Sequence, residues 1–291
     1  IRNKKKIINQ TEIASKILLK SAEILNDFKP DIILILGDRF EMHAIASSAL
    51  ILRIPIVHIH GGELTSGAFD DALRHSITKM SHVHIAAHDT YKKRIIQMGE
   101  NPNSVFSVGS LSIDNIKKIK LLSKIELENK LNIKFKNKNL IVTFHPTTLK
   151  KDSSLVEISN LFNTLKKLRD TLVIFTTNNI DPEADIIMKE IAKEVKISKN
   201  FYLFPSLGQK IYFSILNIFD GVIGNSSSGI IEAPSFNIGI INIGNRQSGR
   251  FRAGQIIDCD VDSKSISVAI KKMYSKKYLN LLKNSSNPFK K

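Results

Sequence analysis

The stretches DIILILGD, residues 31–38, and PIVHIHGG, residues 55–62, are short apolar runs rich in β-branched residues, as expected of buried strands. A helical pattern precedes them at residues 10–28, where apolar residues recur near a period of 3.6. This alternation continues almost throughout the chain. It predicts an α/β fold with parallel sheets, helices on both faces, and ligands at the carboxyl ends of the strands. The further runs are HVHIAAH (82–88), VFSVGS (105–110), LIVTFHP (140–146), LVIFTTN (172–178), FYLF (201–204), GVIGNSSSG (221–229) and GIINIG (239–244).

A Lys-rich connector at residues 114–138 lacks a strand pattern and separates four apolar runs from the other five. We therefore expect a domain boundary near residue 118, with residues 1–118 and 119–291 forming two Rossmann-like, doubly wound domains that face each other across a cleft. The first half has too few strands for a complete domain. The chain also begins at Ile1, inside a helical pattern, so we expect the first domain to be truncated at its N-terminus.

Composition excludes several classes of protein. Hydrophobic residues make up 42% of the 291 residues and charged residues 24%, which argues against disorder and coiled coil. No apolar run approaches the roughly 18 residues that cross a bilayer, and the start lacks the apolar stretch of a secretory signal. A single cysteine, Cys259, permits no intrachain disulfide and no Cys-rich zinc site. We expect a cytoplasmic protein without a membrane partner.

The net charge of +16 is concentrated in three segments, residues 1–20, 116–138 and 264–291, which carry +5, +6 and +8. Together these charges exceed +16, so the rest of the chain is slightly negative. These segments are rich in Lys, Ile and Asn and read as solvated helix faces or connectors. The chain has no Trp and no aromatic residues interleaved for base stacking. We expect no nucleic-acid partner.

Almost every unusual polar cluster follows the end of an apolar run, where a doubly wound fold places its site. The residues at these ends are Asp38 and Arg39; His58, His60, Gly61, Gly62 and Glu63; His145 and Pro146; Asn179 and Asp181; Ser226 to Ser228; and Arg246 and Arg250.

The segment GNSSSGIIEAPSFNIGIINIGNRQSGR, residues 224–250, carries the features of a phosphate site. Serines and glycines at a strand-to-helix turn expose N–H groups and hydroxyls that bind a phosphate or diphosphate, although NSSSG alone is also a plain helix cap. Glu232 lies less than two turns into the predicted helix, where its carboxylate can accept hydrogen bonds from ribose hydroxyls. Arg246 and Arg250 supply planar cationic donors for phosphate oxygens.

The segment HIHGGELTSGAFDDALRHSITKMSHVHI, residues 58–85, is rich in titratable groups. Asp70 and Asp71 begin a predicted helix, where they serve chemistry or merely complement the helix dipole. Seven of the eight histidines lie between His43 and His88, but there is no HExxH pair. We therefore favour acid–base chemistry or structural hydrogen bonds over a metal site.

The motifs GDRFE, HIHGGE, FDDALRHSITKMSH and FHPTT, followed by residues 224–250, resemble the hydrolysing UDP-N-acetylglucosamine 2-epimerase family of sialic acid and related nonulosonate pathways. The resemblance runs from about residue 31 to residue 255. It implies the two-Rossmann architecture called GT-B. It also implies cleavage of a UDP-amino sugar to UDP and a free 2-epimerised sugar of the N-acetylmannosamine type, with no metal and no cofactor, and a homo-oligomer, dimer or tetramer.

The resemblance also assigns roles to residues. It implies that Asp38 and Asp70 are catalytic and that His145 contacts the diphosphate or the leaving oxygen. The animal enzymes and the non-hydrolysing relatives carry a Glu where this chain has His60, so His60 or the nearby Glu63 is left as the acid–base partner. The implied UDP contacts are Arg39, His145, Asn179, Ser226, Ser227, Glu232 and Arg246.

Two other functions fit parts of this pattern. A GT-B glycosyltransferase binds the same nucleotide but passes the sugar to an acceptor. A non-catalytic nucleotide or nucleic-acid binding module would bind without turnover.

Overall fold

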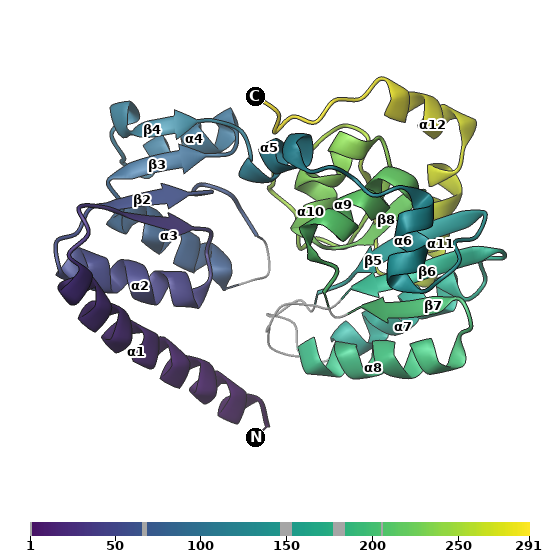
Figure 1. Ribbon diagram of the computed structural model, residues 1–291, viewed down its shortest axis with the longest axis horizontal. Coiled ribbons are helices and arrows are strands. Elements are labelled where there is room, and N and C mark those ends of the chain that lie inside the picture. Colours follow the sequence, from purple (N-terminus) through teal and green to yellow (C-terminus); the bar gives the residue numbers. More distant parts are fainter. Residues whose placement is uncertain (1, 66–68, 146–152, 177–183, 205) are drawn as a thin grey trace. The chain divides into compact units, whose positions relative to one another are not determined.

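The computed structural model describes residues 2–65, 69–145, 153–176, 184–204 and 206–291 (Figure 1). The chain forms two compact units. Unit 1 comprises Ile1–Leu111, Ser248–Phe251 and Phe289–Lys291, and unit 2 comprises Ser112–Gln247 and Arg252–Pro288. Two short segments from late in the chain therefore belong to the first unit.

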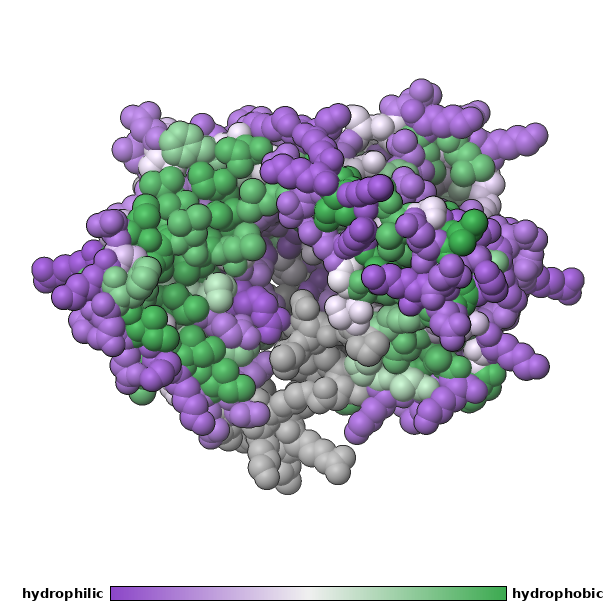
Figure 2. All heavy atoms as spheres, viewed as in Figure 1, coloured by the Kyte–Doolittle hydropathy of each residue, from purple (hydrophilic) through white to green (hydrophobic). Residues whose placement is uncertain are grey.

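Unit 1 contains a four-stranded parallel sheet in the order β1-β2-β3-β4. Helices α2 and α3 pack on one another and contact β2, while α4 packs on β3 and β4. Exposed apolar side chains lie on both edge strands, and Figure 2 shows apolar atoms gathered over this unit. The elements are α1 (Arg2–Phe28), β1 (Ile33–Leu36), α2 (Phe40–Ile51), β2 (Ile56–Ile59), α3 (Asp70–Met80), β3 (Val83–Ala86), α4 (Asp89–Gln97), the 3₁₀-helix η1 (Pro102–Ser104) and β4 (Val105–Ser107).

Unit 2 contains a six-stranded parallel sheet in the order β10-β9-β8-β5-β6-β7. Its elements begin with α5 (Leu111–Lys118), whose first residue is counted in unit 1, and α6 (Lys124–Leu131). The rest are β5 (Lys138–Thr143), α7 (Ser153–Leu165), β6 (Thr171–Thr176), α8 (Ala184–Ile197), β7 (Phe201–Phe204), α9 (Gly208–Ile218), β8 (Gly221–Gly224), α10 (Ser227–Ile231), the 3₁₀-helix η2 (Ala233–Phe236), β9 (Gly239–Ile243), β10 (Ile257–Cys259), α11 (Ser263–Met273) and α12 (Lys276–Lys283).

The six-stranded sheet is buried on both faces, which explains its continuous apolar strands. Along β5, Leu140 and Val142 join the core formed with α7 and α11, whereas Ile141 joins the core formed with α6 and α9. The predicted α/β fold with two parallel sheets is confirmed. Strand β10, the sequence IDC, was not predicted because only one of its three residues is a buried apolar side chain.

The strand order places a topological switch between β5 and β8, because the chain leaves β5 toward β6 on one side and returns to β8 on the other. These two strands approach closely at their carboxyl ends. A Cβ on Gly224, which has φ +144, would overlap the carbonyl oxygen of Thr143, so this position requires glycine. Residues just beyond β5 and β8 thus lie side by side.

Candidate functional site

A buried amide joins the ends of β5 and β8. Asn225 directly follows β8 and is 2% exposed. Its Oδ1 accepts a hydrogen bond from the backbone N–H of His145 at 2.6 Å, and its Nδ2 donates to the His145 carbonyl at 2.8 Å. Because one side chain satisfies both backbone groups of His145, it fixes where that residue leaves the sheet.

Two side chains that follow β9 donate to the backbone carbonyl of Asn225. Arg246 approaches with Nη1 at 3.2 Å, and the buried Gln247 with Nε2 at 2.8 Å. The structure therefore attaches two predicted nucleotide contacts, His145 and Arg246, to the same residue. We call His145, Asn225, Arg246 and Gln247 the β5–β8 cluster.

The serines after β8 begin a helix that is shorter than predicted. Ser226 caps α10 through its hydroxyl, which accepts from the Ser228 N–H, and Ser227 is the first helical residue. The helix ends at Ile231, and Glu232 lies at the junction with η2 and not inside a longer helix, because Pro234, two residues further on, has no N–H to continue the helical hydrogen bonds. Burial, followed by the charge of Glu232, raises the pKa of Tyr212.

In unit 1, a buried arginine gathers the acidic residues that follow the sheet. Arg74 of α3 is 2% exposed and pairs with the carboxylate of Asp38, which follows β1. It also donates to the Glu63 carbonyl at 2.9 Å and the Thr65 hydroxyl at 3.1 Å, and lies 3.4 Å from an oxygen of Asp71. A buried guanidinium needs such partners, and here they orient Asp38.

A second ion pair in unit 1, between Glu63 and Arg250, lies beside His60. The backbone of His60 has φ +66, a conformation that non-glycine residues rarely adopt, and the following glycines turn the chain back. The carboxylate of Glu63 lies 2.7 Å from His60 Nδ1 and 2.6 Å from Arg250 Nη1. Burial alone would raise the pKa of Glu63, but Arg250 and His60 together lower it below its ordinary value.

His58 supports the same end of the sheet. It is fully buried, its Nε2 donates to the Gly37 carbonyl at 2.9 Å, and Nδ1 lies 3.1 Å from the Thr78 hydroxyl. Burial lowers the pKa of His58 from 6.5 to about 4. The neutral ring thus ties the residue before Asp38 to α3.

We expect His58 to make unit 1 sensitive to acid. The unfolded imidazole binds a proton below about pH 6.5 and the folded one only below about pH 4, so stability falls as pH drops through that window. The loss is roughly 3 kcal/mol. His58→Gln should have a smaller drop in urea-unfolding free energy between pH 7.5 and pH 4.5. Other groups with shifted pKa values contribute equally in the wild type and in His58→Gln. Equal drops in the unfolding free energy of the two proteins would therefore contradict this role of His58.

The remaining predicted residues are placed as follows. Asp70 is the half-buried first residue of α3, and Arg39 pairs with Glu41 at 3.2 Å. The carboxylate of Asp71 accepts from the Thr65 N–H at 2.8 Å, so the second acid of the pair has a structural partner. Asn179 lies outside the described residues.

Sequence reasoning missed some residues and misplaced another. Arg74 was missed, although a charged residue on the same helix face as Ile77 and Thr78 is a readable signal of a buried ion pair. Asn225 was also missed, because it reads as part of the NSSSG turn. Arg250 was expected to bind phosphate with Arg246, but it belongs to unit 1 and pairs with Glu63.

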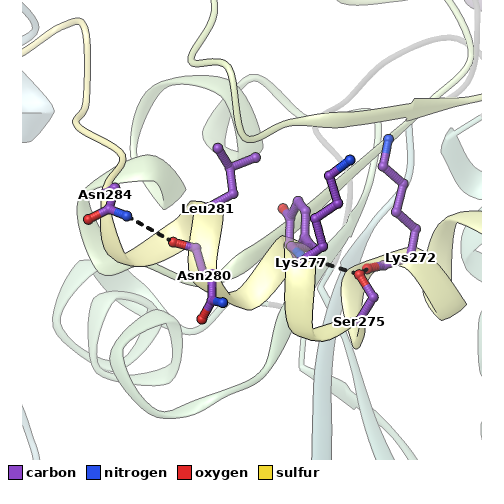
Figure 3. Close-up of a pocket in the computed structure, with 7 residues that line it drawn as sticks. Lys272, Ser275, Lys277, Asn280, Leu281 and Asn284 are labelled. Atoms are coloured by element: carbon purple, nitrogen blue, oxygen red, sulfur yellow. Dashed lines mark hydrogen bonds between the residues drawn. The ribbon is translucent and has the colours of Figure 1, made fainter.

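A cavity in unit 2 shares no residue with these clusters. It has a volume of about 530 Å³, lies along α11 and α12 (Figure 3), and is lined by Lys272, Ser275, Lys277, Tyr278, Asn280, Leu281 and Asn284. Among the described residues, no three His, Cys, Asp or Glu side chains gather as a metal ion would require. In the same part of the chain, every helix is too short or too polar to span a bilayer.

Comparison with known proteins identifies relatives that match most of this chain. The chain is 43% identical over 259 residues to a GDP/UDP-N,N'-diacetylbacillosamine 2-epimerase (hydrolyzing) of Campylobacter jejuni, covering 88% of this chain and 67% of that protein. It is 40% identical over 260 residues to the polysialic acid biosynthesis protein P7 of Escherichia coli, covering 89% and 66%. The chain thus matches about two thirds of the length of these relatives.

The fold and the family model agree with these relatives. The structure matches a UDP-GlcNAc 2-epimerase from Neisseria meningitidis bound to UDP-GlcNAc with a TM-score of 0.78 and 18% identity, covering 96% of this chain and 78% of that one. Such a likeness establishes the fold, here the GT-B type. The model of the family described as UDP-N-acetylglucosamine 2-epimerase matches residues 3–291. The chain therefore belongs to the UDP-N-acetylglucosamine 2-epimerase family.

Proposed function

We propose that the protein is a hydrolysing 2-epimerase that converts a UDP-amino sugar into UDP and the free 2-epimerised sugar. The substrate is UDP-N-acetylglucosamine or a UDP-2,4-diacetamido sugar, and the product feeds nonulosonate synthesis. The names of the Campylobacter and Escherichia coli relatives support this reaction type and this use.

In this proposal, residues of unit 2 bind the nucleotide. Backbone N–H groups and the hydroxyls of Ser226 and Ser227 at the start of α10 bind the diphosphate, with the cation of Arg246 and with His145. Glu232 accepts hydrogen bonds from the ribose hydroxyls. These donors stabilise the charge that develops on the diphosphate as it leaves. Arg39 of unit 1 and Asn179 complete the UDP contacts.

Residues of unit 1 transfer protons. In the first step, a base removes the C2 proton, the C2–H electron pair forms the C1=C2 bond, and the C1–O pair leaves with UDP. In the second step, water adds to C1 of this 2-acetamidoglucal while C2 receives a proton on the opposite face. Asp38, His60, Glu63 and Asp70 are the groups available for these transfers.

The observation that carries the proposal is the group of ionised side chains beyond β1 and β2, where Arg74 holds Asp38 and Arg250 holds Glu63 beside His60. Simple glycosyl transfer removes no proton from carbon. A protein of this family with such a group has side chains that can remove and return a proton at C2 of the sugar.

The direct test is to incubate the protein with each UDP-amino sugar and follow the products by NMR. We expect UDP and a free 2-epimerised sugar to accumulate in equal amounts. Accumulation of the UDP-linked epimer would indicate a non-hydrolysing epimerase. Transfer of the sugar to an added acceptor, without free sugar, would indicate a glycosyltransferase, and UDP binding without turnover a binding module.

A further inference from the structure

Arg250 makes three hydrogen bonds to three consecutive residues of the turn after β2. Its Nη1 donates to a Glu63 carboxylate oxygen at 2.6 Å, its Nε to the Leu64 carbonyl at 2.9 Å, and its Nη2 to the Thr65 hydroxyl at 3.0 Å. The side chains of Arg250 and Glu63 are 7% and 4% exposed. A forked guanidinium bound in this way fixes both the charge and the orientation of its carboxylate partner.

The segment that carries Arg250 is firmly attached to unit 1. The backbone N–H of Phe251 donates to the Tyr91 hydroxyl at 3.1 Å, and the Phe251 ring stacks on His88 with centroids 3.7 Å apart. The preceding Gly249 has φ +79 and lies against Leu64. The guanidinium is therefore presented to Glu63 by a segment with its own anchors.

The second oxygen of Glu63 determines which nitrogen of His60 carries the proton. This Oε1 lies 2.7 Å from His60 Nδ1. A carboxylate accepts hydrogen bonds and cannot donate, so Nδ1 must hold the hydrogen and the neutral ring keeps its lone pair on Nε2. Among the described residues, Nε2 of His60 has no hydrogen-bond partner, and the side chain is 17% exposed. The nitrogen with the lone pair is thus the one open to a ligand.

We infer that Arg250 is a positioning residue for the proposed epimerase reaction: it holds the Glu63 carboxylate, which keeps His60 in the Nδ1–H form with Nε2 as the proton-transferring atom. This inference rests on the proposed function and deepens it. In the elimination step the C2 proton moves to Nε2, and the imidazolium that forms is stabilised by Glu63. Glu63 then acts through His60 and does not itself touch the sugar.

Other charged groups around this turn are held on different atoms. Arg74 of α3 donates to the Glu63 backbone carbonyl, and Arg94 of α4 donates to the Gly62 carbonyl. Tyr91, whose pKa is raised to about 12 by burial and by Glu63, stays neutral, as does His58 on β2. Within the described residues, Arg250 is therefore the cation that pairs with the Glu63 carboxylate itself.

The test measures the tautomer and the kinetics in Arg250→Gln and Arg250→Lys. With ¹⁵N-labelled histidine, the His60 signals are assigned as those missing from the His60→Gln spectrum. We expect the wild-type ring to be protonated at Nδ1 and Arg250→Gln to lose this preference. We also expect kcat to fall roughly 10²- to 10³-fold in Arg250→Gln, with KM changed by less than about fivefold. Arg250→Lys, which keeps a charge, should recover at least about tenfold.

Arg169→Gln is the matched control, because Arg169 is an exposed arginine in the turn between α7 and β6 and should leave kcat and the His60 spectrum unchanged. A fall in kcat with the Nδ1–H form intact would overturn the inference, as would a lost tautomer with wild-type kcat. If Arg250→Gln does not fold, Glu63→Gln gives the same readout by removing the carboxylate from the other side. The spectrum needs no turnover, so an inactive wild-type protein with the Nδ1–H form would reject the proposed reaction and leave the tautomer assignment standing.

Discussion

Asp38→Asn is expected to leave UDP affinity close to the wild-type value while turnover falls roughly 10²- to 10⁴-fold. The substitution keeps the size of the side chain and removes its charge. In the structure Asp38 lies directly after β1 and pairs with the buried Arg74, which orients its carboxylate. Removing a group that acts only in the transition state lowers kcat and leaves ground-state binding unchanged.

The control for this prediction is Asp71→Asn. Asp71 also lies against Arg74, at 3.4 Å, and its side chain is 33% exposed. The control therefore removes one charge near the same guanidinium but leaves Asp38 in place, and its turnover should stay within about tenfold of wild type. If Asp38→Asn turns over as fast as the wild type, its carboxylate serves only to balance Arg74.

Asn225→Ala should destabilise unit 2 by about 2–5 kcal/mol and weaken UDP binding at the same time. The substitution leaves the backbone N–H and carbonyl of His145, which is 7% exposed, without their amide partner. It also loosens the residue to which Arg246 and Gln247 are attached. Urea unfolding and calorimetric titration with UDP measure the two effects.

A neighbouring buried amide separates the two effects. Asn242 on β9 is 3% exposed, and its Nδ2 donates to Asp258 at 2.8 Å and to the Gly244 carbonyl at 3.3 Å instead of to the backbone of His145. Asn242→Ala should cost stability but change UDP affinity less than Asn225→Ala does. An Asn225→Ala protein as stable as the wild type, with unchanged UDP affinity, would show that the amide does not organise the β5–β8 cluster.

Strands with strong apolar runs could be predicted from the sequence. A buried strand such as β6, TLVIFT, is apolar on both faces, and this pattern is local. The positions of strand ends follow from the runs, so Asp38, His60, His145 and Ser226 could be placed beyond the strands that precede them. Element length was harder to predict: α10 ends after five residues because of Pro234, inside a stretch that has a helical pattern.

Pairings between distant segments could not be predicted. Glu63 and Arg250 are 187 residues apart, and Arg250 belongs to Ser248–Phe251, a short segment of unit 1 between two long stretches of unit 2. The spacing of Arg246 and Arg250 gives no sign that the chain passes from one unit to the other between them. A side chain that looks like a phosphate ligand in the sequence is, in the structure, the partner of a buried carboxylate.

The position of deuterium in the product tests the proposed reaction most directly. In heavy water, removal of the C2 proton and its replacement from solvent should place deuterium at C2 of the released sugar, which is detected by NMR together with an equal amount of UDP. The account predicts deuterium in nearly every released molecule. A released sugar that retains its original hydrogen at C2 would contradict elimination and reprotonation, and with it the acid–base role of Asp38 and His60.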